Sequence, residues 1–176
     1  GETYTFSGSL LFNDGAKYSS MIYCSPDVTF ELAGSADCVI TGTNSWPSLR
    51  CTVPGKIIRF GTSVLDAFPV LGGSKVEFKG TAEQPITLAG VDDGTWRLAL
   101  GPQVRQEIRH VVVSGSDASG GLPGMAYASE AGAVANQNWR LVTLPDAGAA
   151  VQWTGAVSGD WNDACNWAPE RVPMET

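Results

Sequence analysis

The groups in this sequence that could do chemistry are few, and the first of them are carboxylates in loops. Asp92 and Asp93 precede Gly94, and Asp160 and Asp163 lie in a second oxygen-rich loop. Calcium prefers hard oxygen ligands of this kind, although neither loop has the twelve-residue pattern of an EF-hand. We therefore expect solvated turns at both places, with calcium binding as the alternative, and we expect no other cofactor.

Nucleophilic catalysis would have to use the single histidine, His110, which lies in the apolar segment 108–113. A catalytic dyad would need a nucleophile such as Ser114 or Ser116 close to this imidazole. No nucleophile motif marks either serine. We therefore predict that His110 is an ordinary outward-facing residue of one strand, that the chain has no catalytic residue, and that it is not an enzyme.

The four cysteines are Cys24, Cys38, Cys51 and Cys165, and no two of them form a CxxC pair. This spacing argues against a zinc ribbon. Four cysteines allow two disulfides in three connectivities. A disulfide within the first third of the chain and free buried thiols both remain open at this point.

Three tryptophans near the C-terminus, Trp153, Trp161 and Trp167, form the next group. We expect them to make one aromatic cluster that pins the tail of the chain. An exposed platform for stacking on sugars is one alternative. An anchor between subunits is the other, because Trp is favoured at the centres of interfaces.

The overall composition excludes several classes of protein. Only 16% of the 176 residues are charged, against roughly 25% in an average soluble protein, which argues against a helical bundle. The net charge of −7 argues against a nucleic-acid binder, which needs clustered Lys and Arg. No apolar run approaches the ~18 residues of a membrane span.

The chain begins with Gly1, so we expect a processed or excised piece of a longer polypeptide.

The elements that must position these groups are short strands. Apolar and polar residues alternate in 28–32, 75–79 and 96–100, between turn-forming residues, as in half-buried strands. Further strands are expected at 4–6, 10–12, 38–41, 57–60, 85–88, 108–113, 139–143 and 151–153. Residues 125–135 form the best helical window, which predicts one helical turn or a loop.

An all-β fold follows, and two architectures fit it. A β-sandwich would pair its strands mostly antiparallel, through hairpins with Asn-Gly or Asp-Gly turns, and only two Asp-Gly pairs occur here. Regular strand spacing with irregular connections favours a parallel β-helix, in which strands stack rung upon rung.

Two segments carry a resemblance to a known family. The sequence from Gly73 to Leu88, followed by Trp96, the Gly120–Gly121 corner and an Asn-rich turn before Trp139, resembles right-handed parallel β-helix modules of large exported bacterial surface proteins, of the autotransporter and adhesin type. The resemblance covers roughly residues 55–144.

The C-terminal segment resembles the motif W-x-G…S-G-x-W-x-x-x-x-N-W…V-P, which opens a new β-rich repeat in such proteins. Trp153, Trp161, Trp167 and Pro173 match it, and Cys165 stands where a small residue is usual. The chain ends soon after Pro173, where such a module should begin its main strands. We therefore expect a piece of a longer polypeptide, or a tail completed by a neighbour.

The resulting prediction has three parts. Residues 1–54, with three cysteines, form an N-terminal cap or the first rungs; residues 55–144 form the β-helical module; residues 145–176 form a linker and a Trp-rich tail that opens or docks to a further module or subunit. We expect an extracellular or cell-surface location. The partners we expect are other copies in a head-to-tail assembly, neighbouring modules of the same polypeptide, or a surface polysaccharide.

The predicted function is a non-enzymatic structural module, a fibre, sheath or adhesin building block. A carbohydrate-binding module is the alternative. A truncated β-helix polysaccharide lyase or hydrolase ranks third, because it would need two placed carboxylates or a carboxylate with a basic partner. Asp92 and Asp93 are the candidates for that pair.

Overall fold

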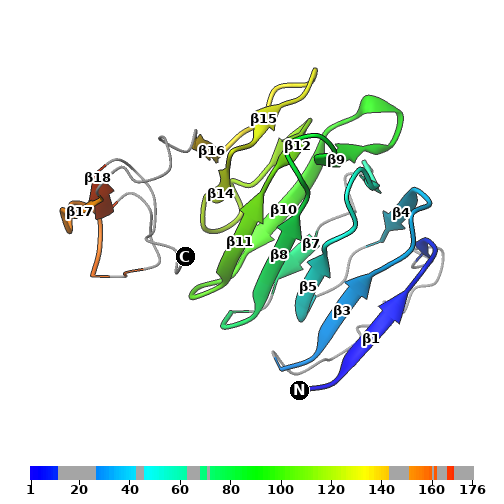
Figure 1. The fold of residues 1–176 in the computed structure, drawn as a ribbon, viewed down its shortest axis with the longest axis horizontal. Helices are drawn as coiled ribbons and strands as arrows, with labels where there is room; N and C mark the ends of the chain where they lie inside the picture. Colours follow the sequence, from blue (N-terminus) through cyan, green and yellow to red (C-terminus); the bar gives the residue numbers. More distant parts are fainter. Residues whose placement is uncertain are drawn as a thin grey trace.

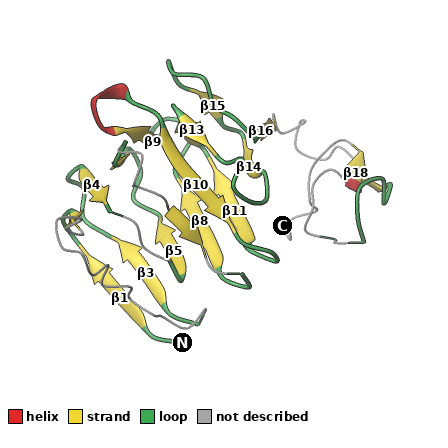
Figure 2. Cartoon of the chain, turned by 180° about the vertical axis from the view of Figure 1, so that it is seen from behind, coloured by secondary structure: helices red, strands yellow, loops and turns green. Residues whose placement is uncertain are grey.

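The computed structural model describes residues 1–11, 27–42, 46–62, 68–70, 72–142, 151–159, 161 and 166–168. In these ranges the chain is all-β, as predicted, apart from the short 3-10 turn η1 (Val91–Asp93) and a 3-10 residue, Asn166, just before β18. Figure 2 shows η1 projecting beyond the strands. None of the described residues belongs to a helix long and apolar enough to cross a membrane.

A parallel sheet of seven strands is the largest element of the fold. Figure 1 shows β1, β3, β5, β8 and β11 side by side in chain order, from blue to green. The strands are, in order across the sheet, β1 (Thr3–Phe6), β3 (Thr29–Leu32), β5 (Ser48–Cys51), β8 (Lys75–Lys79), β11 (Arg105–Arg109), β14 (Gly124–Tyr127) and β16 (Trp139–Val142).

Two further parallel sheets contain the intervening strands. The six-stranded sheet consists of β15 (Glu130–Ala131), β12 (Val111–Val113), β9 (Ile86–Gly90), β6 (Ile57–Phe60), β4 (Cys38–Thr41) and β2 (Leu10–Leu11). The three-stranded sheet consists of β13 (Ser116–Asp117), β10 (Trp96–Leu100) and β7 (Phe68–Val70). In the tail, β17 (Gln152–Trp153) and β18 (Trp167–Ala168) pair antiparallel.

Consecutive strands lie in different sheets. The chain passes from β8 in the first sheet to β9 in the second and β10 in the third, and then returns to the first sheet at β11. The strands β8, β9 and β10 begin at residues 75, 86 and 96, so this regular spacing is the step from one sheet to the next. Neighbours within a sheet are much farther apart in sequence, since Lys75 pairs with Arg105. This arrangement is compatible with a parallel β-helix, and the antiparallel pairing of a β-sandwich is absent from the three described sheets.

The core lies on the inward faces of these sheets. In the six-stranded sheet Cys38, Ile58, Leu88 and Val113 are register neighbours, and each is at most 1% exposed. The side-chain period of two, repeated at a fixed register, places apolar groups on apolar groups from strand to strand. The register therefore produces a continuous apolar row through the sheet.

Large aromatic side chains pack within the core. The rings of Phe60 and Trp96 stack with centroids 4.0 Å apart, and the Trp96 Nε1 donates to the carbonyl of Ser114 at 2.9 Å. At β14 a Cβ on Gly124 would lie 2.5 Å from the Trp139 ring. Glycine is therefore required there by the close approach of the indole.

The described strands of residues 1–54 belong to the same sheets as those of residues 55–144. β5 pairs with β8, and β4 pairs with β6. The predicted strands 38–41, 57–60, 75–79 and 96–100 are confirmed as β4, β6, β8 and β10. The strands β5, β7 and β13 were not among the predicted elements.

Two sequence predictions are wrong. Residues 108–113 do not form one strand, because His110 adopts a left-handed conformation (φ 49°) and ends β11 before β12 begins. The helical window 125–135 instead contains β14 and β15, separated by a corner at Ala128 (φ 46°). The two corners stack, since the His110 N–H donates to the Tyr127 carbonyl and the Ala128 N–H to that of Val142. These hydrogen bonds, from each corner to the last residue of the next strand in the sheet, override the local sequence pattern.

The core row generates a stability prediction. Leu88→Ala removes a fully buried side chain between Ile58 and Val113, so the free energy of unfolding should fall by about 2–5 kcal/mol. Thr87→Ala, on the outward face of the same strand, should cost less than about 1 kcal/mol. Urea unfolding of both variants measures the difference, and equal losses would contradict the assigned inward face.

Candidate functional site

A network of ion pairs lies on the outward face of the seven-stranded sheet. On β3, β5, β8 and β11, most of the residues that alternate with buried core positions are charged, with Thr29 and Ser48 as the polar exceptions. The parallel register places Glu31, Arg50, Glu77 and Glu107 in one row across these four strands. The row brings together residues that are far apart in sequence.

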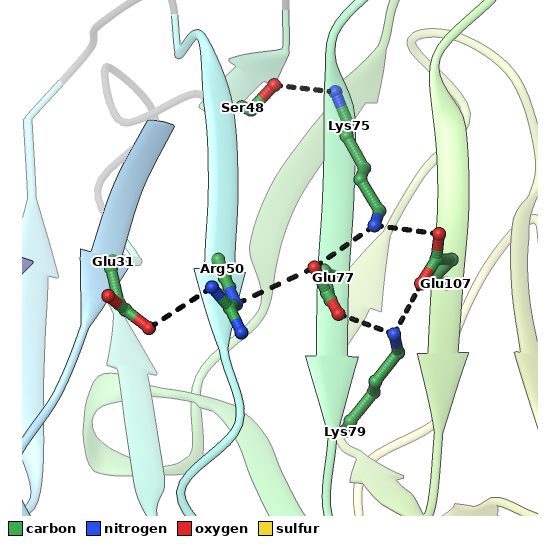
Figure 3. Close-up of polar contacts among 7 residues, drawn as sticks. All are labelled: Glu31, Ser48, Arg50, Lys75, Glu77, Lys79 and Glu107. Carbon is green, nitrogen blue, oxygen red and sulfur yellow. Dashed lines mark hydrogen bonds and ion pairs between the residues drawn. The ribbon is translucent and has the colours of Figure 1, made fainter. Parts of the chain in front are cut away.

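The ion pairs link each strand to the next, as Figure 3 shows. Arg50 lies 3.6 Å from Glu31 and 3.7 Å from Glu77. The Lys75 Nζ lies 3.1 Å from Glu77 and 2.7 Å from Glu107, and Lys79 contacts both glutamates. Glu77 and Glu107 lie directly opposite each other, and two like charges in this position would destabilise the sheet. The two lysines, one on either side of Glu77, offset that repulsion.

These contacts shift the pKa values of the network. Burial raises the pKa of Glu77, but hydrogen bonds from Lys79 and Lys75 outweigh it and hold that pKa below its ordinary 4.5. Burial likewise raises the pKa of Glu107, and the same two lysines lower it below 4.5. Burial lowers the pKa of Lys79, but its bonds to Glu107 and Glu77 raise it above the ordinary 10.5.

The three tail tryptophans contact one another. Trp153 and Trp167 are register partners on β17 and β18. The Trp161 ring stacks on Trp153 with centroids 4.8 Å apart and lies edge-on to Trp167 at 5.2 Å. Trp167 is buried, whereas Trp161 is 62% exposed. The cluster therefore presents one indole, supported from behind by a second, to the solvent.

A buried asparagine holds the backbone of this cluster in place. The Asn166 Oδ1 accepts hydrogen bonds from the N–H groups of Val157 and Ser158, both at 2.8 Å. Its Nδ2 donates to the Ser158 Oγ at 2.8 Å. The Asn-Trp pair of the sequence motif is thus structural: Asn166 orders the loop and Trp167 supports the exposed ring.

The carboxylates considered for calcium are not gathered into a site. Asp92 and Asp93 are exposed on η1, with φ values of 52° and 56°. Among the described residues no group of three or more His, Cys, Asp or Glu side chains could hold a metal ion. Asp160 and Asp163 lie outside the described residues, so calcium there stays a prediction.

Two of the four cysteines are described, and both are free. Cys38 and Cys51 are buried thiols, and burial raises the pKa of each. Of the two alternatives that the sequence left open, these two residues take the second, free buried thiols that pack as small apolar side chains. Cys24 and Cys165 lie outside the described residues.

A buried lysine near these thiols was not among the predicted features. Lys56 is 1% exposed, and its Nζ donates to the carbonyls of Ala33 at 3.3 Å, Gly34 at 3.0 Å and Ala36 at 2.5 Å. Three carbonyl dipoles therefore compensate for the lost hydration of the ammonium group. Its position five residues after Cys51, in a turn, gives no sequence signal for burial.

The histidine and the two serines form no catalytic arrangement in the described part of the chain. His110 occupies a corner rather than a strand. The Ser114 Oγ accepts a hydrogen bond from the Val134 N–H at 3.1 Å. The Ser116 Oγ is buried and makes no hydrogen bond to the described residues. No hydrogen bond joins His110 to either serine.

Comparison of the chain with models of protein families, with curated proteins and with solved structures gives no match.

The ion-pair network predicts a pH-dependent stability. Lys79→Met should lower the free energy of unfolding at pH 7 by about 1 kcal/mol or less, because Lys79 and Glu107 are partly exposed. Lowered carboxyl pKa values stabilise the fold above pH 4.5 and stop doing so as the pH falls through them. The difference between wild type and variant should therefore shrink below pH 4.5.

Urea unfolding between pH 3 and pH 8 measures this difference. Arg59→Met is the matched control, because Arg59 on β6 makes no ion pair with described residues. A loss for Lys79→Met that stays constant down to pH 3 would contradict the role of the glutamates.

Proposed function

We propose that the chain is a right-handed parallel β-helix and serves as a non-enzymatic structural module of an exported bacterial surface protein, a building block of a fibre, sheath or adhesin. The observation that carries the proposal is the parallel, in-register pairing of successive strands in three sheets. Such a fold adds units along one axis, each in contact with its neighbours. The sequence resemblance described above supports the same assignment.

The edges of the large sheet support an assembly role. In the described part of the chain, β1 and β16 are the outer strands of the seven-stranded sheet. Pairing of β16 with β1 of another copy would continue the same parallel ladder. A head-to-tail contact of this kind is heterologous and extends into a filament unless it closes.

The hydrogen bonds of β1 identify a residue that tests this role. The N–H groups of Thr29 and Ala33 donate to the carbonyls of Glu2 and Phe6. In a parallel ladder this pattern directs the N–H groups of Tyr4 and Phe6 toward β3, and that of Thr5 toward the open edge. Proline at position 5 therefore removes a donor that the β1–β3 pair does not use.

We expect the wild-type chain to form long assemblies, detected by light scattering and negative-stain microscopy. Thr5→Pro should abolish them while leaving the circular dichroism spectrum of the monomer unchanged. Thr5→Ala, which keeps the N–H group, should assemble like the wild type. A wild-type chain that stays monomeric at high concentration, or a Thr5→Pro variant that still assembles, would contradict growth through β1.

A second candidate function, carbohydrate binding, is favoured by the exposed ring of Trp161. This ring is 62% exposed and stacks on Trp153, so its free face is preorganised for the apolar face of a sugar. A platform of this kind requires an aromatic ring and no charge.

A glycan array and calorimetry with neutral oligosaccharides test this candidate. Trp161→Ala should weaken binding by up to about tenfold, the loss of one aromatic contact, and Trp161→Tyr should retain most of it. Absence of binding to any glycan, or equal binding by wild type and Trp161→Ala, would remove the candidate.

A further inference from the structure

The outward face of the seven-stranded sheet carries a concentration of positive charge that is unusual for this acidic chain. The chain has 11 Lys and Arg residues and a net charge of −7. Six of the 11 project from this one face, against three glutamates (Glu31, Glu77 and Glu107) at the outward positions of β3, β8 and β11. The six are Arg50, Lys75, Lys79, Arg105, Arg109 and Arg140.

Neighbouring strands on this face repeat the same order of charge. β8 carries Lys75, Glu77 and Lys79, and β11 carries arginine, glutamate and arginine at the paired positions. The side chains of Lys75 and Lys79 turn toward the two glutamates and neutralise them. The charges of these four residues are therefore balanced within the sheet.

Arg105 and Arg109 take no part in these ion pairs. Each lies beside a lysine in the register, Arg105 beside Lys75 and Arg109 beside Lys79, and neither makes an ion pair with a described residue. The two arginines are four positions apart on an extended strand, which places their Cα atoms about 13 Å apart. The face thus presents two uncompensated guanidinium groups on one rigid strand.

We propose that this face binds an anionic polysaccharide, with the guanidinium groups of Arg105 and Arg109 holding carboxylates on separate sugar units. A guanidinium group presents paired N–H donors that match a carboxylate. Because the strands on both sides are fixed in the sheet, binding requires little reordering of the backbone. This role goes beyond the structural one proposed above and does not depend on it.

Two observations favour a glycan over other anionic partners. β8 and β11 carry no exposed large hydrophobic side chain, whereas the centre of a protein interface is apolar and rich in aromatic residues. Duplex nucleic acid carries one charge per about 1.7 Å, a higher charge density than that of a uronate polymer with one charge per sugar. A chain of net charge −7 therefore repels nucleic acid more strongly than it repels such a polymer. A hydrated, moderately charged polymer fits the face better.

The test uses polygalacturonate, a linear uronate polymer, with dextran as the neutral comparison. The wild-type chain should bind polygalacturonate and not dextran, and its affinity should fall as salt is raised, because exposed charges are screened over about 10 Å at 0.1 M. The double variant Arg105→Gln/Arg109→Gln should bind at least about tenfold more weakly. Neither arginine makes an ion pair with a described residue, so the thermal unfolding of the double variant should match that of the wild type.

The matched control is Arg59→Gln/Arg97→Gln, which changes the net charge equally on β6 and β10, outside the seven-stranded sheet. It should bind like the wild type. The proposal would be overturned by a wild type that does not bind polygalacturonate, by an equal loss in the control, or by tighter binding to duplex DNA. It would also be overturned if the Arg105→Gln/Arg109→Gln change abolished self-association at low salt, since the face would then join copies of the chain.

Discussion

Parallel pairing at a fixed register is the constraint on which the other features depend. The same backbone positions meet from strand to strand, so one apolar residue requires apolar residues at the matching place in its neighbours. A shift of β9 by one residue would bring Thr87 or Ala89 to the place of Leu88, between Ile58 and Val113. Every side chain of the strand would also change face. Burial of the core rows therefore fixes the register, and the register places the outward charges.

The corners allow this register to persist while the length of each connection varies. A single residue, His110, separates β11 from β12, whereas residues 80–85 separate β8 from β9. Both connections use the same ladder, because the Gly80 N–H donates to the Arg109 carbonyl and the His110 N–H donates to that of Tyr127. Extra residues are thus accommodated outside the ladder. For this reason register partners lie 30 residues apart at Lys75 and Arg105 but only 15 apart at Gly124 and Trp139.

The sequence predicted the all-β class and the strands with clear alternation, such as 75–79, because inward and outward positions there differ sharply in polarity. It did not predict β5, which has Ser48 and Arg50 at its outward positions and only two apolar residues, nor the corner at His110, which interrupts an apolar run. The ion-pair network depends on β8 lying beside β11 rather than β9. The repeated patterns K-x-E-x-K at 75–79 and R-x-E-x-R at 105–109 were the available signal for that adjacency.

The outward charges divide into those that order the sheet and those that do not. Exposed ion pairs add little free energy, but Glu77 and Glu107 repel each other unless Lys75 and Lys79 lie between them. The network therefore contributes more to the correct pairing of β8 with β11 than to overall stability. Two guanidinium groups lie beside this network without entering it. They are not needed to hold the strands together, and they leave the face with positive charge available for contacts outside the chain.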